Sequence, residues 1–508
     1  MKVLLAYPNV GAQVGFNYGL SYIGACLKRA GHEVTLLDIN DRLGSDLDDE
    51  GFLREVERTR PDLVGFSVVT PQWPRTRQYA AALKRRHPEI PVVCGGIHAT
   101  TSPEETIRSG VVDYVIRGEG EEAVCELAEA IDRGAPVDGI ANLCYRGEDG
   151  AVRCNAVRPF APLDTLPPKD YEAFDFQTMI DAKNGWVGLM TSRGCPFRCT
   201  YCFNHAIVEL YKADTGLGGR ALNYIRHHDI DTVMREIEYL LANYRGIRMF
   251  IFDDDLFTFD RDYVLAFCRE YGRRVDVPFV CNAHVKVFDR ELAEALREAG
   301  CRIVKFGLES GSERVRTEVM HRYMTNDEIE RAFAVGNAAG LHTSAFVMIG
   351  LPGETRDERM ETVDLLARTR PGRFRWSVFC PFPGTQAAEL AAELGQIDRG
   401  RLERLVNFTD ESCLDFGPVE NLHISKLARA MPWFVNARSG GAQAGAYREK
   451  VEQIVALDAE GWAAREASIR DEDAELSERL LAEGVGHYAI KYNPFMAVAS
   501  DYFTREDA

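Results

Sequence analysis

The sequence lacks an apolar stretch long enough to cross a membrane, and its start lacks the features of a secretion signal. MKVLLAYPNVGAQVGF contains a short apolar run, but no basic segment and no small-residue cleavage site. We therefore expect a cytoplasmic protein without a membrane span.

Positive charge is also scarce. The chain carries 60 lysines and arginines against 78 aspartates and glutamates, which gives a net charge of −18. This balance argues against binding of nucleic acid or of an anionic bilayer through a large positively charged surface. The expected partner is a small-molecule substrate or another protein.

Cysteine is too sparse for a disulfide scaffold, since 508 residues contain 13 of them. The odd count and the missing secretion signal favour free thiols and metal ligands in a reducing compartment. No short-period repeat or low-complexity tail is present. The length is sufficient for two or three domains, each with its own core.

The first part of the chain alternates short apolar runs with amphipathic stretches. This pattern predicts buried parallel strands joined by helices, a doubly wound α/β (flavodoxin-like) domain over residues 1–145. The predicted strands are 3–8, 33–39, 63–69, 92–97 and 114–118, with helices at 20–31 and 75–87. Ligands of such sheets bind beyond the carboxyl ends of the strands, where residues 9–17, 70–74, 95–100 and 118–121 follow.

A Pro-rich passage then predicts a linker over 146–184, after which the alternation restarts. Residues 185–395 are expected to form a partial (β/α)6 barrel with its active site at the carboxyl ends of the strands. Its predicted strands are 186–192, 249–254, 279–285, 303–310, 344–350 and 375–381. Residues 396–508 are predicted to be a mostly helical, substrate-related region without strands.

Three cysteines lie in one short loop, TSRGCPFRCTYC, directly after the first predicted barrel strand. Iron–sulfur clusters normally have four thiolate ligands, so Cys195, Cys199 and Cys202 would leave one iron open to another ligand. The alternative is structural zinc with His205 as a fourth ligand, although zinc spacings usually show two cysteine pairs.

The segment CPFRCTYC resembles the CxxxCxΦC signature of radical S-adenosylmethionine (SAM) enzymes, with Tyr201 at the aromatic position. The resemblance implies a 4Fe-4S cluster whose open iron binds SAM, and reductive cleavage of SAM to a 5'-deoxyadenosyl radical. It also implies an electron donor such as flavodoxin or ferredoxin.

Further segments along the barrel are similar to cofactor-binding motifs of the same family. They are IFDDDLF (251–257), FGLESGSERV (306–315), FVMIGLPGET (346–355) and FCPFPGT (379–385). The cofactor-binding candidates are Tyr201, Asp253, Asp254, Asn282, His284, Glu309, Ser310, Gly350 and Pro352. A carboxylate among 253–255 would bind the ammonium group of SAM, with one of the three merely solvated. Glu309 would accept hydrogen bonds from SAM or, alternatively, form an ion pair with Lys305, and His284 is alternatively a packing residue.

The first domain resembles the cobalamin-binding domains that precede radical barrels, through residues 18–38, 67–100 and 112–124. The residues that would contact the corrin ring and the nucleotide tail of cobalamin are Thr70, Trp73, Gly95, Gly96, His98, Gly118 and Glu119. The cobalamin signature DxHxxG is absent, so we expect no histidine ligand below the cobalt. Trp73 and His98 are alternatively packing residues.

The resemblance implies a cobalamin-dependent radical SAM enzyme that uses a 4Fe-4S cluster, SAM and cobalamin. Methylation of an unactivated carbon is the main hypothesis, and a cyclase, ring-contraction or rearrangement enzyme is the alternative. Three weaker alternatives are a methylthiotransferase with a second cluster on Cys26, Cys94 and Cys125, a cobalamin sensor, and a nicotinamide-binding domain. The last lacks an ordered GxGxxG after the first strand.

Overall fold

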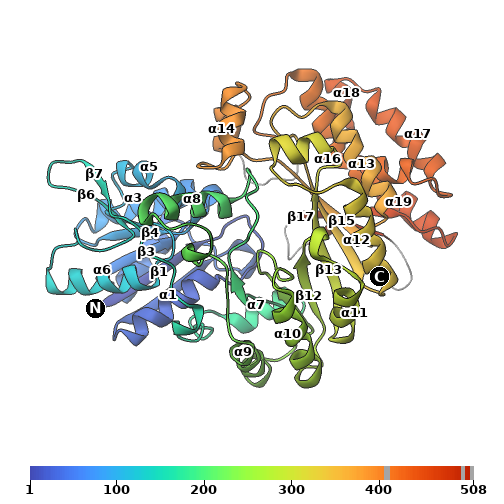
Figure 1. Cartoon of the computed structure of the whole chain (residues 1–508). Coiled ribbons are helices and arrows are strands. Elements are labelled where there is room, and N and C mark those ends of the chain that lie inside the picture. The colour runs from blue at the N-terminus through green and yellow to red at the C-terminus, as the bar shows by residue number, and fades with distance from the viewer. Residues whose placement is uncertain (405–411, 494–497, 504–508) are drawn as a thin grey trace. The chain divides into compact units, whose positions relative to one another are not determined.

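The computed structural model describes residues 1–404, 412–493 and 498–503. The chain divides into two compact units (Figure 1). The first comprises residues 1–195, 202–247 and 382–384, and the second comprises 196–201, 248–381 and 385–508. Each unit is described separately.

The first unit contains the predicted doubly wound sheet. Its five parallel strands lie in the order β2-β1-β3-β4-β5, which confirms the predicted fold class. The bounds are β1 (Lys2–Pro8), β2 (Glu33–Ile39), β3 (Leu63–Ser67), β4 (Val92–Gly95) and β5 (Tyr114–Ile116).

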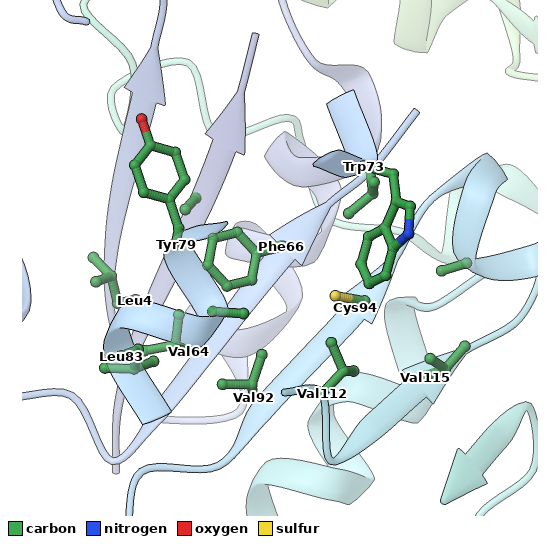
Figure 2. Close-up of a cluster of buried hydrophobic side chains, with 14 of the residues drawn as sticks. Leu4, Val64, Phe66, Trp73, Tyr79, Leu83, Val92, Cys94, Val112 and Val115 are labelled. Carbon is green, nitrogen blue, oxygen red and sulfur yellow. The ribbon is translucent and has the colours of Figure 1, made fainter. Parts of the chain in front are cut away.

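Helices cover both faces of this sheet, as the alternation of apolar and amphipathic segments predicts. They are α1 (Tyr18–Arg29), α2 (Asp49–Thr59), α3 (Trp73–Arg86), α4 (Ile97–Thr101), α5 (Pro103–Arg108) and α6 (Glu121–Arg133). Figure 2 shows one core, where Leu4, Val64 and Phe66 of the sheet meet Tyr79 and Leu83 of α3. Leu5 points the other way, toward Gly24 of α1.

An antiparallel hairpin that the sequence did not reveal extends the sheet beyond β5. It consists of β6 (Leu143–Arg146) and β7 (Val152–Cys154). Cys144 and Cys154 face each other in this hairpin and form a disulfide. The prediction of free thiols is therefore wrong for this pair, because the register brings together two cysteines ten positions apart. The other eleven cysteines form no disulfide.

The rest of the first unit includes the strand before the cysteine loop and the elements that flank it. The predicted strand is present as β8 (Trp186–Leu189). The other elements are α7 (Phe176–Ala182), β9 (Ser192–Arg193), α8 (Phe203–Thr215), β10 (Arg226–His227) and α9 (Ile230–Asn243). β9 and β10 pair antiparallel, with Arg193 opposite Arg226.

The second unit contains the other five predicted barrel strands. They are parallel and lie in the order β15-β14-β13-β12-β11. The bounds are β11 (Met249–Phe252), β12 (Phe279–Ala283), β13 (Cys301–Glu309), β14 (His342–Ile349) and β15 (Arg373–Val378). The helices between them are α10 (Arg261–Arg274), α11 (Arg290–Glu298), α12 (Asn326–Ala338) and α13 (Arg356–Thr369).

One face of these strands packs against helices, and the opposite face forms the inner surface of the partial barrel. Phe306 of β13 packs against Phe333 of α12, with ring centroids 5.0 Å apart. Because side chains alternate along a strand, Lys305 and Gly307 belong to the inner face.

The last part of the chain is mostly helical, as predicted. It contains α14 (Gln386–Glu393), α15 (Arg399–Arg404), α16 (Pro418–Arg438), α17 (Ala444–Val455), α18 (Ala459–Arg465) and α19 (Ile469–Ala482). Trp376 of β15 donates its indole N–H to the Ala428 carbonyl of α16 at 2.6 Å, which ties this region to the sheet. The expectation that strands stop near residue 395 is wrong, because β16 (Tyr488–Asn493) and β17 (Val498–Phe503) form an antiparallel hairpin. Among the described residues, no helix is long and apolar enough to span a membrane.

Gly95, the last residue of β4, and Gly96, which follows it, give a matched test of the fold. Gly96 has a φ of +90°, and a Cβ there would lie 2.8 Å from the Val68 carbonyl oxygen. A Cβ on Gly95 would meet no atom within 4 Å. We predict that Gly96→Ala lowers the free energy of unfolding by about 2–4 kcal/mol, through left-handed strain and the backbone clash.

Gly95→Ala is the control and should change that free energy by less than about 1 kcal/mol. Denaturant titration of the full chain, followed by circular dichroism, measures both variants. Equal stability of the two would contradict the assigned backbone at Gly96.

Candidate functional site

The cysteine loop runs from β9 to the first turn of α8. Cys199 is buried, Cys195 and Cys202 are partly buried, and none of the three forms a disulfide. Cys202 is the N-cap residue of α8, where the helix dipole stabilises a thiolate. Three cysteines outside disulfides, one of them at a helix N-terminus, fit the donor chemistry of an iron–sulfur cluster.

Two of the sulfurs accept hydrogen bonds from neighbouring side chains. Arg322 donates from Nη1 to Cys199 Sγ at 3.6 Å, and Asn204 donates from Nδ2 to Cys202 Sγ at 3.6 Å. Hydrogen bonds to cluster sulfurs tune the reduction potential, so both donors suit this role. No group of three or more His, Cys, Asp or Glu side chains is arranged as a metal site in the described part of the chain. Cluster ligation by the cysteines therefore stays a prediction.

The start of the cysteine loop is fixed by the acidic segment that follows β5. Arg193, two residues before Cys195, forms ion pairs with Glu119 at 3.0 Å and with Glu121 at 2.6 Å. Glu119 also accepts a hydrogen bond from Arg226 Nη1 at 3.0 Å. Burial alone would raise the pKa of Glu119, but the positive charges of Arg193 and Arg226 outweigh this effect and lower the pKa. Glu119 thus positions the loop through Arg193.

Gly118, the other candidate in this segment, lies against α8. Its φ is +71°, and a Cβ there would lie 2.3 Å from the hydroxyl oxygen of Tyr211. That same hydroxyl accepts a hydrogen bond from the Glu119 N–H at 2.9 Å. The structure therefore gives Gly118 and Glu119 structural contacts, and their predicted contact with cobalamin stays untested.

Glu309 ends β13 in a strained conformation beside Arg322. Its φ is +66°, and the register with β14 shifts between Gly307 and Glu309. Such an outlier in a non-glycine residue is typical of functional positions. Burial raises the pKa of Glu309, whereas Arg322 and a hydrogen bond with Tyr201 act against this shift. Arg322, rather than the expected alternative Lys305, is the cation that acts on Glu309.

Gly307 makes room for this arrangement. A Cβ at position 307 would lie 2.3 Å from Glu309 Oε1 and 2.8 Å from Arg322 Nη2. Arg322 in turn donates from Nη2 to the Gly307 carbonyl oxygen at 2.7 Å. Arg322 was not predicted from the sequence, because an arginine outside any strand gives no motif signal.

The middle of the cysteine loop contacts two other parts of the second unit. Phe197 stacks on the imidazole of His284, with ring centroids 4.0 Å apart. Burial, reinforced by Arg322 and Lys286, lowers the pKa of His284 to about 3, so the ring is neutral. Thr200 donates its hydroxyl to the Val319 carbonyl oxygen at 2.6 Å. These contacts support a packing role for His284.

The acidic residues after β11 differ in burial. Asp254 is fully buried, and its carbonyl oxygen accepts a hydrogen bond from Asn282 Nδ2 at 2.8 Å. Asp253 and Asp255 are exposed. Asn282 therefore holds the backbone at the end of β11, and Asp253 and Asp255 are the accessible carboxylates of this segment.

Ser310, directly after Glu309, forms hydrogen bonds with residues that follow it closely in the chain. Its carbonyl oxygen accepts a hydrogen bond from Arg316 Nη1 at 2.5 Å, and its hydroxyl accepts one from the Ser312 N–H at 3.2 Å. These bonds stabilise the turn after Glu309. A direct contact of Ser310 with a cofactor remains a prediction.

The GLPGE turn after β14 folds around its own glutamate. Glu354 Oε2 accepts hydrogen bonds from the N–H groups of Gly350 at 2.6 Å and Leu351 at 3.3 Å. Gly350 has a φ of +74°, and Pro352 is buried. Burial raises the pKa of Glu354 to about 7, although Arg359 acts against this. Glu354 was not among the sequence-based candidates.

Polar groups without partners lie in the first unit at the ends of β2 and β3, where a ligand of this sheet would bind. The hydroxyl of Thr70 has no hydrogen-bond partner among the described residues, and neither oxygen of Asp38 has one. Burial raises the pKa of Asp38 to about 7. Together with the open space at Gly95, these groups fit a ligand rich in amides, such as cobalamin. Asp38 was not predicted.

Trp73 and His98 pack against each other within the core. Their ring centroids are 5.0 Å apart, and both side chains are buried. Figure 2 shows the indole of Trp73 above Cys94. Burial lowers the pKa of His98 to about 4, so its ring is neutral. The packing alternative for both residues is supported, and their contact with cobalamin is untested.

Comparison with known proteins identifies two domains in this chain. Residues 9–128 match the B12 binding domain, and residues 189–366 match the radical SAM superfamily. An uncharacterized methyltransferase, PH0819 of Pyrococcus horikoshii, is 30% identical over 401 residues, which cover 77% of this chain and 83% of that protein. The chain belongs to the cobalamin-dependent radical SAM family.

Two further similarities agree with this membership. The anaerobic magnesium-protoporphyrin IX monomethyl ester cyclase of Rubrivivax gelatinosus is 26% identical, covering 78% of this chain and 70% of the cyclase. The structure of the radical SAM methyltransferase TsrM from Kitasatospora setae, with tryptophan and a SAM analog bound, is 24% identical. Its TM-score is 0.62, and the match covers 77% of this chain and 76% of TsrM. This structural match supports the fold.

The predicted family and its cofactor set of cobalamin, SAM and a 4Fe-4S cluster are thus confirmed. The methylthiotransferase alternative is disfavoured, because it needs Cys26 and Cys94 as ligands of a second cluster. Cys94 is buried beneath Trp73 in the core, and Cys26 lies inside α1. The match of residues 9–128 to the B12 binding domain disfavours the nicotinamide alternative, and the match of residues 189–366 to the radical SAM superfamily disfavours structural zinc.

We predict that the three loop cysteines hold the cluster. Anaerobically reconstituted protein should contain about four irons per chain. The triple variant C195A/C199A/C202A should lose this iron and its visible absorption. Cys125→Ala, at a half-buried thiol on α6, is the control and should keep both. Iron that survives the triple replacement would refute the assignment.

We also predict that cobalamin binds without a histidine ligand to cobalt. The physical reason is that the candidate His98 is already buried in a stack with Trp73. Electron paramagnetic resonance of the cob(II)alamin form should show no nitrogen superhyperfine splitting, and His98→Phe should leave the spectrum unchanged. Nitrogen splitting that disappears in His98→Phe would show that the prediction is wrong.

Proposed function

We propose that this protein is a cobalamin-dependent radical SAM C-methyltransferase that methylates an unactivated carbon of a small molecule. The observation that supports the proposal is that one chain contains a B12 binding domain and a radical SAM domain with an intact cysteine loop. The naming of PH0819 as a methyltransferase supports it.

When bound, the cluster and SAM supply a carbon-centred radical, and cobalamin supplies the methyl group. The protein must therefore hold its cofactors rigidly and protect a radical from water. Cys195, Cys199 and Cys202 would hold the cluster, and Arg322 would place positive charge beside Cys199. Positive charge next to a thiolate favours the reduced, more negative state of a cluster.

The chain's own residues near the loop suit a site for SAM. Glu309 is half-buried and has a strained backbone at the strand end, so it is positioned before any ligand binds. Its carboxylate would accept a hydrogen bond from the SAM ammonium or ribose. Gly350 and Pro352 form a tight turn on the neighbouring strand, where the backbone can approach a flat ring.

The domain assignments are part of the same proposal. Residues 1–145 would bind cobalamin, 185–395 would carry the radical chemistry, and 396–508 would contribute to the substrate site. The proposed electron donor is a flavodoxin or ferredoxin, and the proposed location is the cytoplasm.

A cyclase or rearrangement enzyme is the second candidate. It is favoured by the similarity to the magnesium-protoporphyrin cyclase of Rubrivivax gelatinosus over most of this chain. Both candidates would use the same cofactors, so only the products separate them.

We predict that turnover with substrate yields S-adenosylhomocysteine and 5'-deoxyadenosine in about equal amounts. The reason is that a methyltransferase of this kind uses one SAM as methyl donor and another as radical source. Mass spectrometry of the product after reaction with SAM carrying a deuterated methyl group should show the label on carbon.

Glu309→Gln provides an informative variant of this assay, since it keeps the shape and removes the charge. Deoxyadenosine should fall at least about tenfold, because a charge-assisted hydrogen bond to SAM is weakened. Deoxyadenosine formed by wild-type enzyme without homocysteine product and without a mass gain would favour the cyclase or rearrangement candidate.

A further inference from the structure

Two polar side chains at the carboxyl end of β2 have hydrogen-bonding atoms without partners. Among the residues that the structure describes, nothing bonds to either carboxyl oxygen of Asp38 or to the Nδ2 group of Asn40. These atoms are shielded from water, and Asn40 is fully buried. An unpaired buried polar group costs free energy, so such a group calls for a ligand that completes its bonding.

The backbone that carries both side chains is fixed by Ser45. Its hydroxyl donates to the Asp38 carbonyl oxygen at 2.7 Å, and the Asn40 N–H donates to Ser45 Oγ at 3.1 Å. The orientation of the Asn40 side chain is fixed as well, since its Oδ1 accepts a hydrogen bond from the Arg42 N–H at 2.9 Å. Nδ2 is therefore left as a donor in a defined direction.

The two side chains belong to the same side of β2. Leu37 packs into the core against α3, so Asp38 on the alternating strand faces the other way. Asn40 has extended backbone angles, φ −141° and ψ 119°, and therefore shares the side of Asp38. Asp38 lies opposite Tyr7 of β1, where burial and the charge of Asp38 raise the pKa of Tyr7 to about 12.

This side of β2 ends at the edge where ligands of a doubly wound sheet bind. The Asn9 N–H, just after β1, donates to the Ile39 carbonyl oxygen at 2.8 Å, so the ends of both strands are held together there. The segment lies within residues 9–128, which match the B12 binding domain. Asp38 and Asn40 are thus placed to meet cobalamin.

The unpaired atoms offer acceptors at one position and a donor at the next position on the same side. A primary amide is complementary, since its N–H groups suit the Asp38 oxygens and its carbonyl oxygen suits Asn40 Nδ2. It is also long enough to bridge side chains that start about 6.6 Å apart on a strand. A phosphate or carboxylate would be repelled by the carboxylate of Asp38.

We propose that Asp38 and Asn40 bind a primary amide side chain on the rim of the corrin ring. Asp38 would accept a hydrogen bond from the amide N–H, and Asn40 would donate one to the amide oxygen. The inference deepens the proposed function by naming residues that recognise its cofactor. It rests on the cobalamin cofactor of the family and does not depend on methyl transfer.

The test is titration of cobalamin-free, full-length protein with aquacobalamin and, separately, with diaquacobinamide, followed by absorbance. Cobinamide keeps the amides of the corrin ring but lacks the nucleotide tail. Asp38→Ala should weaken binding of both corrinoids about tenfold or more and by a similar factor. Asn40→Asp should also weaken both, because it keeps the acceptor for the Arg42 N–H and removes the donor.

Two control variants and a stability measurement separate loss of the site from loss of the fold. Asp46→Ala removes an exposed carboxylate shortly after β2 and should bind both corrinoids normally. Asp38→Asn keeps an acceptor oxygen and should retain more affinity than Asp38→Ala. Without cobalamin, Asp38→Ala should melt at least as high as wild type, because it removes an unpaired buried carboxyl group.

Four results would overturn the proposal. They are unchanged affinity of Asp38→Ala, weakening confined to cobalamin, wild-type binding of cobalamin without binding of cobinamide, and a lower melting temperature of cobalamin-free Asp38→Ala. The second and third would assign the contact to the nucleotide tail, and the last would assign Asp38 a structural role. Because turnover is not measured, a failure here is distinguishable from a failure of the proposed methyl transfer.

Discussion

The contact between the Arg322 guanidinium and its three neighbours is the interaction on which the rest of the candidate site depends. Arg322 reaches Cys199 in the cysteine loop, the Gly307 carbonyl in β13 and the charge of Glu309. Burial acts against ionisation of Arg322, but Tyr201, Glu309 and Cys199 together raise its pKa. One fixed positive charge thus joins the loop that would hold the cluster to the strand that would hold SAM.

The first unit fixes the cysteine loop in a comparable way. Glu119 and Glu121 bind Arg193 just before Cys195, and Asn204 contacts Cys202 just after the loop. The acidic segment GEGE, which the sequence suggested as part of the cobalamin site, therefore has a second use. It restrains the loop that a radical enzyme must keep ordered.

The repeated strands and the cysteine loop were predictable from the sequence, because period-two burial and thiolate spacing are local signals. The β6–β7 hairpin with its disulfide and the β16–β17 hairpin were missed, since antiparallel additions to an α/β chain follow no repeat. Arg322, Asp38 and Glu354 were missed for a related reason. Their importance comes from burial and from partners that are distant in sequence or absent, which only three-dimensional packing reveals.

Position 307 has a consequence for attempts to redirect this enzyme to new substrates. A Cβ there would lie 2.3 Å from Glu309 Oε1 and 2.8 Å from Arg322 Nη2, so both long side chains would have to leave their present positions. Mutant libraries that aim at new substrates should therefore keep Gly307 fixed, because any other residue at this position would move the carboxylate proposed to bind SAM.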